Sequence, residues 1–521
     1  MAYSKTVDLN SQGWYLDINP STLLGRWTKY ADIVSVNTTD AYGIQVLSGI
    51  TVNTWGGNDK IFAFGKEIGI SNDFGTINTG CGNDTITGTG NDYGIANGGT
   101  INTNSGNDSI VGINIDIADL DIFNKGIGNS GTINTGDGND RICGSSSARN
   151  GIGIDNSGTI DTGYGNDTIT GNGNKYGIYN LYQRNITTGD GNDTIIGNAV
   201  TGNAVDLEGV GIQNESSIET SAGNDIIFGS SDGGYIHSGI ANYNTINTGD
   251  GNDTITGIST ATEGAGYGIL NGSTLIPTGI DPSGHSPIFT GITGIINTSD
   301  GDDKITGINA ATNGMGIENS GTIDTDDGND KITGINVAAN GIGINNDYSN
   351  IDVSNKGTIN TSNGDDTIIG INHGIDGTGI QNVGTINTGD GDDTIIGIND
   401  GINGIGILNV GTINTGAGND IVDALIGGFR GFRDGIFILG DNNDTVKGFG
   451  SGNFDGGNGI DKLLFGSGTY SVSNITNNDG YYTVSNGTID MFVNNFEWIG
   501  SANDPASAFS FTTVIGQTFT V

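Results

Sequence analysis

Several residue types are scarce in this chain, and each shortage excludes a class of protein. Only two cysteines, Cys81 and Cys143, occur among 521 residues. They occupy different positions of their repeats, so we expect no disulfide between them. Lysine and arginine together number 17 against 58 acidic residues, which gives a formal net charge of −41. Such a surface repels nucleic acid and anionic membranes, so neither is an expected partner.

Long apolar runs are also missing. No stretch reaches the length of a transmembrane helix, and we expect no transmembrane segment. The N-terminal stretch Met1–Asp8 lacks the basic-then-apolar pattern of a cleaved signal peptide. If the protein is exported, we therefore expect its export signal to lie elsewhere in the chain.

The residues of common catalytic sites are poorly supplied. The three histidines, His237, His285 and His373, fall in unrelated positions, and we expect each to be a surface-loop residue. The chain has neither the H-E-x-x-H pattern nor the G-x-S-x-G pattern. We therefore predict that the protein is not an enzyme.

Glycine, in contrast, is abundant, with 96 residues against only 5 prolines. Because the glycines do not follow a G-X-Y period, collagen is excluded, and the composition indicates many turns with positive φ. Three of the prolines fall in one segment, Gly272–Gly294, which predicts a stiff surface loop.

The most prominent feature is a repeat built around a glycine turn. Residues Gly131–Gly144 read G-T-I-N-T-G-D-G-N-D-R-I-C-G, and the Gly-Asn-Asp or Gly-Asp-Asp triplet recurs along most of the chain. Its thirteen copies end at Asp59, Asp84, Asp108, Asp140, Asp167, Asp193, Asp225, Asp253, Asp303, Asp330, Asp366, Asp393 and Asp420. A sequence motif that recurs in this way along most of the chain indicates a solenoid.

Each repeat contains three short strand patterns. They are T-I-N-T, as in Thr132–Thr135, then the segment after the turn, as in Asp167–Thr170, and G-I-x-N, as in Gly153–Asn156. Three strands and three corners per repeat predict an all-β fold, a right-handed parallel β-helix of about 14 three-strand rungs. Since side chains alternate along a strand, we expect the isoleucines, Asp140 and Asn156 to point inward.

Asparagine holds one inward position in nearly every repeat, and stacked amides can bond to one another and to the backbone. We interpret this row as a structural ladder. Its members are Asn72, Asn97, Asn129, Asn156, Asn180, Asn214, Asn242, Asn271, Asn319, Asn346, Asn382 and Asn409.

The ends of the chain differ from the repeats. Residues 1–50 carry aromatic residues and no repeat turn, so we interpret them as an N-terminal cap. Residues 51–466 form the predicted β-solenoid, which the loop at 272–294 interrupts. Residues 467–521 are aromatic strands without repeat turns, which predicts a C-terminal β cap.

The turn aspartates need something to balance their charge. Carboxylates stacked about 5 Å apart repel by roughly 3 kcal/mol at an effective dielectric of 20. Protonation, hydrogen bonds from the backbone or bound cations would each relieve this repulsion. Carboxylates and turn carbonyls are the ligands that calcium prefers, and calcium tolerates irregular shells of six to eight oxygens.

One copy of the turn makes a family resemblance explicit. Gly456–Leu463 reads G-G-N-G-I-D-K-L and resembles the G-G-x-G-x-D-x-U-x nonapeptide of the repeats-in-toxin (RTX) calcium-binding family. Most other copies lack its first glycine. The family carries two such turns per coil, whereas each repeat here carries one, so the resemblance implies one column of calcium sites. The implied calcium ligands are the thirteen repeat aspartates together with Asp444 and Asp461.

The resemblance also implies a cellular location. RTX proteins are typically exported by type I secretion through an uncleaved C-terminal signal, and residues 467–521 are similar to such a tail. Calcium is scarce inside the cell and abundant outside it, so we expect the repeats to fold outside the cell. The expected location is extracellular or at the cell surface.

These observations favour a calcium-binding structural protein of a surface layer, a matrix or an adhesion system. Its expected partners are calcium ions and either a cell-surface polysaccharide or further copies of the chain. Two alternatives stay open. Parallel β-helices also host polysaccharide-active enzymes, and the T-x-N columns could form a face that binds ice or another regular surface.

Overall fold

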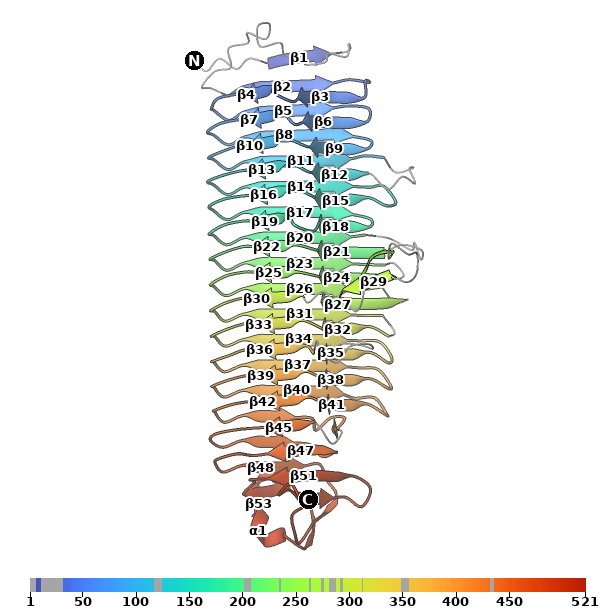
Figure 1. Cartoon of the computed structure of the whole chain (residues 1–521), viewed down its shortest axis with the longest axis vertical. Coiled ribbons are helices and arrows are strands. Elements are labelled where there is room, and N and C mark those ends of the chain that lie inside the picture. The colour runs from blue at the N-terminus through green and yellow to red at the C-terminus, as the bar shows by residue number, and fades with distance from the viewer. Residues whose placement is uncertain are drawn as a thin grey trace. The chain divides into compact units, whose positions relative to one another are not determined.

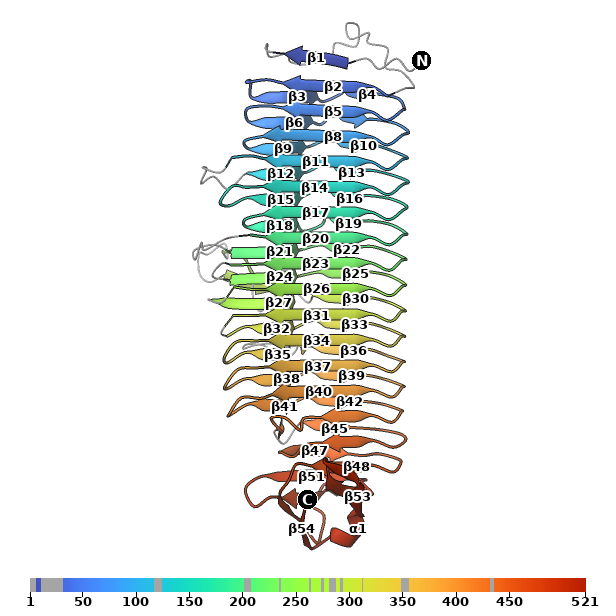
Figure 2. The same cartoon turned by 180° about the vertical axis from the view of Figure 1, so that it is seen from behind.

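The computed structural model describes residues 6–10, 31–116, 124–200, 208–233, 236–261, 264–272, 276–280, 287–290, 294–311, 313–347, 356–431 and 435–521. The chain divides into two compact units, Met1–Ala261 and Thr262–Val521. Each unit is a parallel β-solenoid with three sheets, here named sheets A, B and C, which confirms the predicted fold class (Figures 1 and 2).

Unit 1 repeats the order sheet A, sheet B, sheet C in every rung. Sheet A contains β1 (Thr6–Asn10), β2 (Ile33–Asn37), β5 (Lys60–Phe64), β8 (Thr85–Gly90), β11 (Ser109–Asn114), β14 (Arg141–Ser146), β17 (Thr168–Gly173), β20 (Thr194–Ala199), β23 (Ile226–Ser231) and β26 (Thr254–Ser259). Sheet B contains β3 (Tyr42–Leu47), β6 (Ile68–Asp73), β9 (Tyr93–Asn97), β12 (Lys125–Asn129), β15 (Ile152–Asn156), β18 (Tyr176–Asn180), β21 (Glu208–Asn214) and β24 (Ile236–Asn242). Sheet C contains β4 (Thr51–Asn53), β7 (Thr76–Asn78), β10 (Thr100–Asn102), β13 (Thr132–Asn134), β16 (Thr159–Asp161), β19 (Asn185–Thr187), β22 (Ser217–Glu219) and β25 (Thr245–Asn247).

Unit 2 follows the same order as far as β44 (Phe429–Gly431), the last described strand of sheet B, and strands of sheets C and A then alternate. Its sheet A contains β31 (Lys304–Asn309), β34 (Lys331–Asn336), β37 (Thr367–Asn372), β40 (Thr394–Asn399), β43 (Ile421–Asp423), β46 (Thr445–Lys447), β48 (Lys462–Phe465) and β52 (Trp498–Ser501). Sheet B contains β27 (Ala265–Asn271), β32 (Met315–Asn319), β35 (Ile342–Asn346), β38 (Thr378–Asn382), β41 (Ile405–Asn409) and β44 (Phe429–Gly431). Sheet C contains β30 (Ile295–Asn297), β33 (Thr322–Asp324), β36 (Thr358–Asn360), β39 (Thr385–Asn387), β42 (Thr412–Asn414), β45 (Ile436–Ile438), β47 (Gly452–Asp455) and β51 (Asp490–Asn494).

The rungs stack in register because identical residues face one another across neighbouring strands. In sheet C, for example, Ile101 pairs with Ile133, and Ile133 pairs with Ile160. Ile101, Ile133 and Ile160 are fully buried. The strands of sheets A and B contribute a buried isoleucine to the rung in the same way. Since burying an isoleucine contributes about 1.5–3 kcal/mol, these narrow rows of isoleucine form the core of each unit.

The C-terminal end of unit 2 has a different core and different pairing. Phenylalanine replaces isoleucine at Phe437 and Phe454, whose rings stack 4.3 Å apart. Beyond them, β49 (Thr469–Val472), β50 (Tyr482–Ser485), β53 (Asp504–Ser510) and β54 (Thr518–Thr520) pair antiparallel, and α1 (Phe511–Val514) is a single short turn. These elements lie within the segment interpreted from the sequence as the C-terminal β cap.

The expected N-terminal cap and the insertion loop fall partly outside the described residues. Of residues 1–50, the part around β2 and β3 stacks in parallel on β5 and β6. Of the loop at 272–294, the structure describes β28 (Ile276–Ile280) and β29 (Pro287–Thr290), which form an antiparallel pair. Among the described residues, none of the helices has the length and apolar character that crossing a bilayer requires.

Candidate cation site at the glycine turns

The aspartates predicted to bind calcium lie at the corner that leads from sheet C to sheet A. Each follows the glycine turn directly and precedes the sheet A strand, as Asp140 precedes β14. All fifteen side chains are buried, at no more than 2% exposure. They point into each solenoid, as strand alternation predicted, and we call the row the aspartate column.

Backbone amides satisfy one oxygen of each carboxylate. The amide of Asp140 donates to Oδ1 of Asp167 at 2.7 Å, and the amide of Asp167 donates to Oδ1 of Asp193 at 2.7 Å. The same bond links the column from Asp32 to Asp253 in unit 1 and from Asp303 to Asp461 in unit 2. Each carboxylate from Asp59 to Asp253 and from Asp330 to Asp461 therefore caps the backbone of the rung before it.

The other carboxylate oxygen is left without a donor. Oδ2 is buried and has no hydrogen-bond partner in Asp59, Asp84, Asp108, Asp140, Asp167, Asp193, Asp225, Asp330, Asp366, Asp393, Asp420, Asp444 and Asp461. A buried acceptor without a donor costs about 1–3 kcal/mol, and more when it is charged. The column therefore contains a row of oxygen atoms that could accept a proton or coordinate a cation.

A buried threonine stands five residues before each repeat aspartate, and most of these hydroxyls bond to a backbone carbonyl rather than to Oδ2. The Thr162 hydroxyl lies close enough to lower the pKa of Asp167, yet it donates its proton to the carbonyl of Thr188 in the next rung at 3.2 Å. Thr135 and Thr220 donate to the next threonine carbonyl in the same way. Because a hydroxyl has one proton, these three hydroxyls do not also donate to Oδ2. The hydroxyls of Thr79, Thr188 and Thr325 make no bond to a carbonyl, and each lowers the pKa of the aspartate that follows it.

Burial raises the pKa of these carboxyl groups above the usual value of 3.8. Desolvation is the largest cause, and the nearby threonine hydroxyl and the hydrogen bond from the backbone oppose it. The pKa rises to about 6 for Asp84, Asp253, Asp393 and Asp461, and to about 7 for Asp108, Asp167, Asp225, Asp330, Asp366, Asp420 and Asp444. Near neutral pH, the column without a cation therefore carries a mixture of acids and carboxylates.

The turn in front of the aspartate is held by further bonds between rungs. The amide of Gly138 donates to the carbonyl of Tyr164 at 2.7 Å, and the amide of Asn166 donates to Oδ1 of Asn139 at 2.9 Å. Gly138 has φ of +145°, and a Cβ atom there would lie 1.7 Å from the carbonyl oxygen of Gly106. Only glycine fits this position, which explains why the second glycine of G-x-G persists in almost every copy.

Neighbouring carboxylates do not gather into a cluster. Within the part of the chain that the structure describes, no group of three or more His, Cys, Asp or Glu side chains could hold a metal ion. A cation in the column would therefore take carboxylate oxygens from adjacent rungs and complete its shell with carbonyl oxygens or water.

The two ends of the column were not anticipated. Asp32 is buried before β2, and its amide donates to Oδ1 of Asp59 at 2.7 Å. At the other end the amide of Asp461 donates to Oε2 of Glu497 at 2.8 Å. The sequence signal for Asp32 is the Asp-Ile-Val of residues 32–34, in which Asp32 directly precedes β2, whereas no local signal marks Glu497.

The predicted asparagine ladder is confirmed within both units. In unit 1 the side-chain amide of Asn129 donates to Oδ1 of Asn156 at 2.9 Å and to the carbonyl of Thr159 at 2.9 Å. The ladder links Asn72 to Asn242 in unit 1 and Asn271 to Asn409 in unit 2. Within each unit, every amide but the last bonds to the next amide, and all of them bond to the backbone, as Asn409 does to the carbonyl of Ile436, so the ladder is structural.

The histidines are dispersed, but one expectation about them is wrong. His237 lies in β24 and is fully buried, with Nδ1 against the Ser259 hydroxyl, because its strand extends further than the repeat pattern predicted. His373 is exposed and pairs with Asp400 at 3.2 Å, and His285 lies outside the described residues. Both cysteines are free, as expected.

Comparison with known proteins gives no relative for this chain: no family model, no curated protein and no solved structure matches it. The resemblance to RTX repeats therefore rests on the turn motif alone.

Proposed function

We propose that the protein is a non-enzymatic structural β-solenoid of the extracellular space or the cell surface, and that calcium binds along its aspartate column. The observation that carries this proposal is the row of buried Oδ2 atoms without hydrogen-bond partners. A structural role follows from the way the repeats occupy most of the chain.

The unpartnered oxygens need a proton or a cation. With pKa values of about 6 to 7, protons neutralise only part of the column at pH 7. A hard divalent cation neutralises the remaining carboxylates and accepts oxygen ligands from two rungs at once. Calcium suits the site better than magnesium, because calcium tolerates irregular shells and gives up its water more easily.

Calcium binding would also couple folding to export. If the chain leaves the cell through a C-terminal signal in residues 467–521, it meets high calcium only after export. Binding free energy then adds to folding free energy. The turn bonds between rungs do not need a cation, so calcium adds to a framework of backbone hydrogen bonds.

The test is thermal melting followed by circular dichroism in EDTA, in calcium and in magnesium, at pH 8 and at pH 5. We expect calcium to raise the melting temperature at pH 8 and to raise it much less at pH 5, where protons fill the column. Magnesium serves as the matched control and is expected to have a smaller effect. Equilibrium dialysis should then find several calcium ions bound per chain.

If calcium neither binds nor changes the melting temperature at pH 8, the metal part of the proposal is wrong. The aspartates would then act as backbone caps that hold protons, and the structural role would rest on the repeats alone.

One observation favours a second candidate, a face that binds ice or another regular surface. Outward threonines of sheet C stand in register at Thr76, Thr100, Thr132 and Thr159. In unit 2, however, the outward asparagines bond to one another, as Asn414 does to Asn387 at 2.7 Å, which uses groups that would face water. A thermal hysteresis assay tests this candidate, and we expect no hysteresis. Assays on polysaccharides test the enzymatic alternative in the same way.

A further inference from the structure

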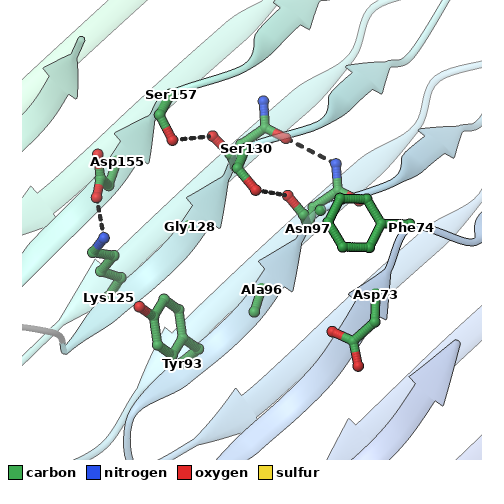
Figure 3. Close-up of a pocket in the computed structure, with 12 residues that line it drawn as sticks. Asp73, Phe74, Tyr93, Ala96, Asn97, Lys125, Gly128, Ser130, Asp155 and Ser157 are labelled. Atoms are coloured by element: carbon green, nitrogen blue, oxygen red, sulfur yellow. Dashed lines mark hydrogen bonds and ion pairs between the residues drawn. The ribbon is translucent and has the colours of Figure 1, made fainter. Parts of the chain in front are cut away.

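A groove with a volume of about 300 Å³ lies on the outer face of sheet B in unit 1. It crosses β6, β9, β12 and β15, and none of its lining residues belongs to a glycine turn; Figure 3 shows these residues. None of its residues belongs to the aspartate column. Two of them, Asn97 and Asn129, belong to the asparagine ladder. We call it the sheet B groove.

Two small residues make the floor of the groove. The first and fourth residues of each x-G-I-x-N strand face outward, and at the fourth position Ala96 pairs in register with Gly128. The strands on either side carry larger residues there, Ser71 and Asp155. Two adjacent rungs without bulky side chains therefore leave a hollow between rungs that have them.

One wall of the groove has no net charge. Lys125 forms an ion pair with Asp155, and its Nζ lies 5.6 Å from the centre of the Tyr93 ring. The Tyr93 ring lies against Gly128, where a Cβ atom would come within 2.8 Å of it. Both charged groups of this wall are thus engaged with each other, and the aromatic ring packs between the Lys125 ammonium group and the backbone of Gly128.

The opposite wall carries an exposed ring and a carboxylate. Phe74 is 76% exposed, and Ala96 lies between it and Tyr93 in Figure 3. Its φ of +63° is a conformation that bulky residues rarely adopt. Beside it, Asp73 accepts hydrogen bonds of 2.7 Å from the Gln45 amide and the Ser71 hydroxyl.

We propose that the sheet B groove binds a neutral oligosaccharide, with the apolar face of a pyranose ring against Phe74 and its hydroxyl groups bonded to Asp73 and to the serine hydroxyls of the groove. A hydrophobic ring next to a few fixed polar groups is the usual chemistry of a small-molecule site. Ser130 and Ser157 donate to backbone carbonyls at 3.3 and 3.2 Å, so their oxygens remain able to accept hydrogen bonds.

The charge of the groove argues for a neutral sugar. Lys125 is balanced by Asp155, which leaves the carboxylate of Asp73 without a cation among its hydrogen-bond partners. The whole chain has a net charge of −41, so an acidic sugar would be repelled during its approach. The inference does not depend on calcium, because none of the groove residues belongs to the aspartate column.

The experiment is isothermal titration of the full chain with cellohexaose, a neutral oligosaccharide with flat apolar faces, and with the hexamer of galacturonic acid as its anionic counterpart. Calcium is present throughout, so that a failure of the calcium proposal and a failure of this one are distinguishable. We expect cellohexaose to bind and the acidic hexamer to bind at least about tenfold more weakly.

Two variants locate the site. Phe74→Ala removes the exposed ring, and Ala96→Gln fills the floor with the residue that β3 and β21 already carry at this position, Gln45 and Gln213. Each is expected to weaken cellohexaose binding by about tenfold or more. The matched control is Tyr164→Ala, which removes an exposed ring from a glycine turn and should leave binding unchanged.

The proposal is overturned if cellohexaose does not bind, if the acidic hexamer binds better, or if both groove variants bind as tightly as the unaltered chain. Circular dichroism melts of the three variants establish that each is folded, and the two groove variants change the site in opposite ways, one by removing a side chain and one by adding one.

Discussion

The asparagine ladder and the aspartate column are both buried rows of polar side chains in each solenoid, and their side chains differ in one atom per rung. The asparagine ladder contains amides that both donate and accept, so the side chain of Asn129 bonds to Asn156 and to a carbonyl. The aspartate column contains carboxylates that only accept, so Asp167 takes one bond at Oδ1 and none at Oδ2. In a column of amides, donors and acceptors can pair with one another. A column of carboxylates contains only acceptors, so it needs a proton or a cation from outside.

The largest expected difference between the columns is in their response to pH. Because burial raises the pKa of the column aspartates from 3.8 to about 6 or 7, the folded state binds more protons than the unfolded state. The stabilisation by these protons is complete below about pH 4 and is lost as pH rises through 6 and 7. In EDTA we expect a melting temperature at pH 8 that is roughly 10 °C or more below that at pH 5.

Melts at several pH values between 5 and 8 measure this effect. Calcium should flatten the curve, and a melting temperature in EDTA that is constant or rises with pH would show that the aspartates do not hold protons in the folded state.

Reciprocal substitutions then interchange the two chemistries, and the first is expected to be costly. In Asn156→Asp, the new oxygen would face Oδ1 of Asn180 and the carbonyl of Asn185, which Asn156 now bonds at 2.9 and 3.1 Å. Two acceptors lose their donor and a charge is buried. We therefore expect the free energy of unfolding to fall by about 3–5 kcal/mol. Urea denaturation measures it.

The control for this substitution is Asn134→Asp, the same chemical change on the outward face of β13. It should cost no more than about 1 kcal/mol, because the new carboxylate is partly exposed to water, which screens its repulsion by the neighbouring carboxylate of Asp161. Equal losses in the two variants would mean that the ladder contributes nothing specific.

The opposite substitution, Asp167→Asn, is expected to stabilise the metal-free protein at pH 8. It removes a buried charge and places an amide donor beside the Thr162 hydroxyl oxygen, which is near this side chain. We expect a gain of about 1–2 kcal/mol at pH 8 in EDTA and little change at pH 5.

Denaturation at both pH values measures the gain, with the exposed turn residue as a control in Asp190→Asn, which should change nothing. A loss of stability for Asp167→Asn at pH 8 would show that the carboxylate itself is needed there even without metal.

The smallest effect is expected for Thr162→Val, which removes a hydroxyl and keeps the shape of the side chain. The carbonyl of Thr188 loses its donor, and the pKa of Asp167 should rise further because the hydroxyl now lowers it. We expect a loss of about 1 kcal/mol, measured by urea denaturation. An unchanged free energy of unfolding would mean that the hydrogen bond from this hydroxyl makes no net contribution to stability.

Much of this comparison could be read from the sequence. The alternation of side chains along T-I-N-T and G-I-x-N predicted that Ile133, Asp140 and Asn156 point inward, because strand geometry alone decides the face. The glycine turn predicted the corner, because positive φ at positions such as Gly138 belongs to glycine.

Other features depend on how rungs of unequal length come into register, which no local pattern reveals. Asn309, Asn336 and Asn372 form a second buried amide ladder in unit 2, and Glu497 reaches the column from outside the repeats. The sheet B groove is of the same kind, because Ala96 and Gly128 become neighbours only through stacking.

The bond that links the aspartates also gives assembly a direction. The backbone amide of each column aspartate donates to the carboxylate of the rung that follows it in the chain. In unit 2 the last of these amides, that of Asp461, donates to the carboxylate of Glu497. If rungs form from the N-terminus, the amide of the newest rung has no carboxylate to bond until the next rung forms. If rungs form from the C-terminal end, each new amide finds the carboxylate of the following rung already in place. Pulsed hydrogen exchange during refolding would show protection spreading from Asp461 toward Asp303, and spreading the other way would refute this order.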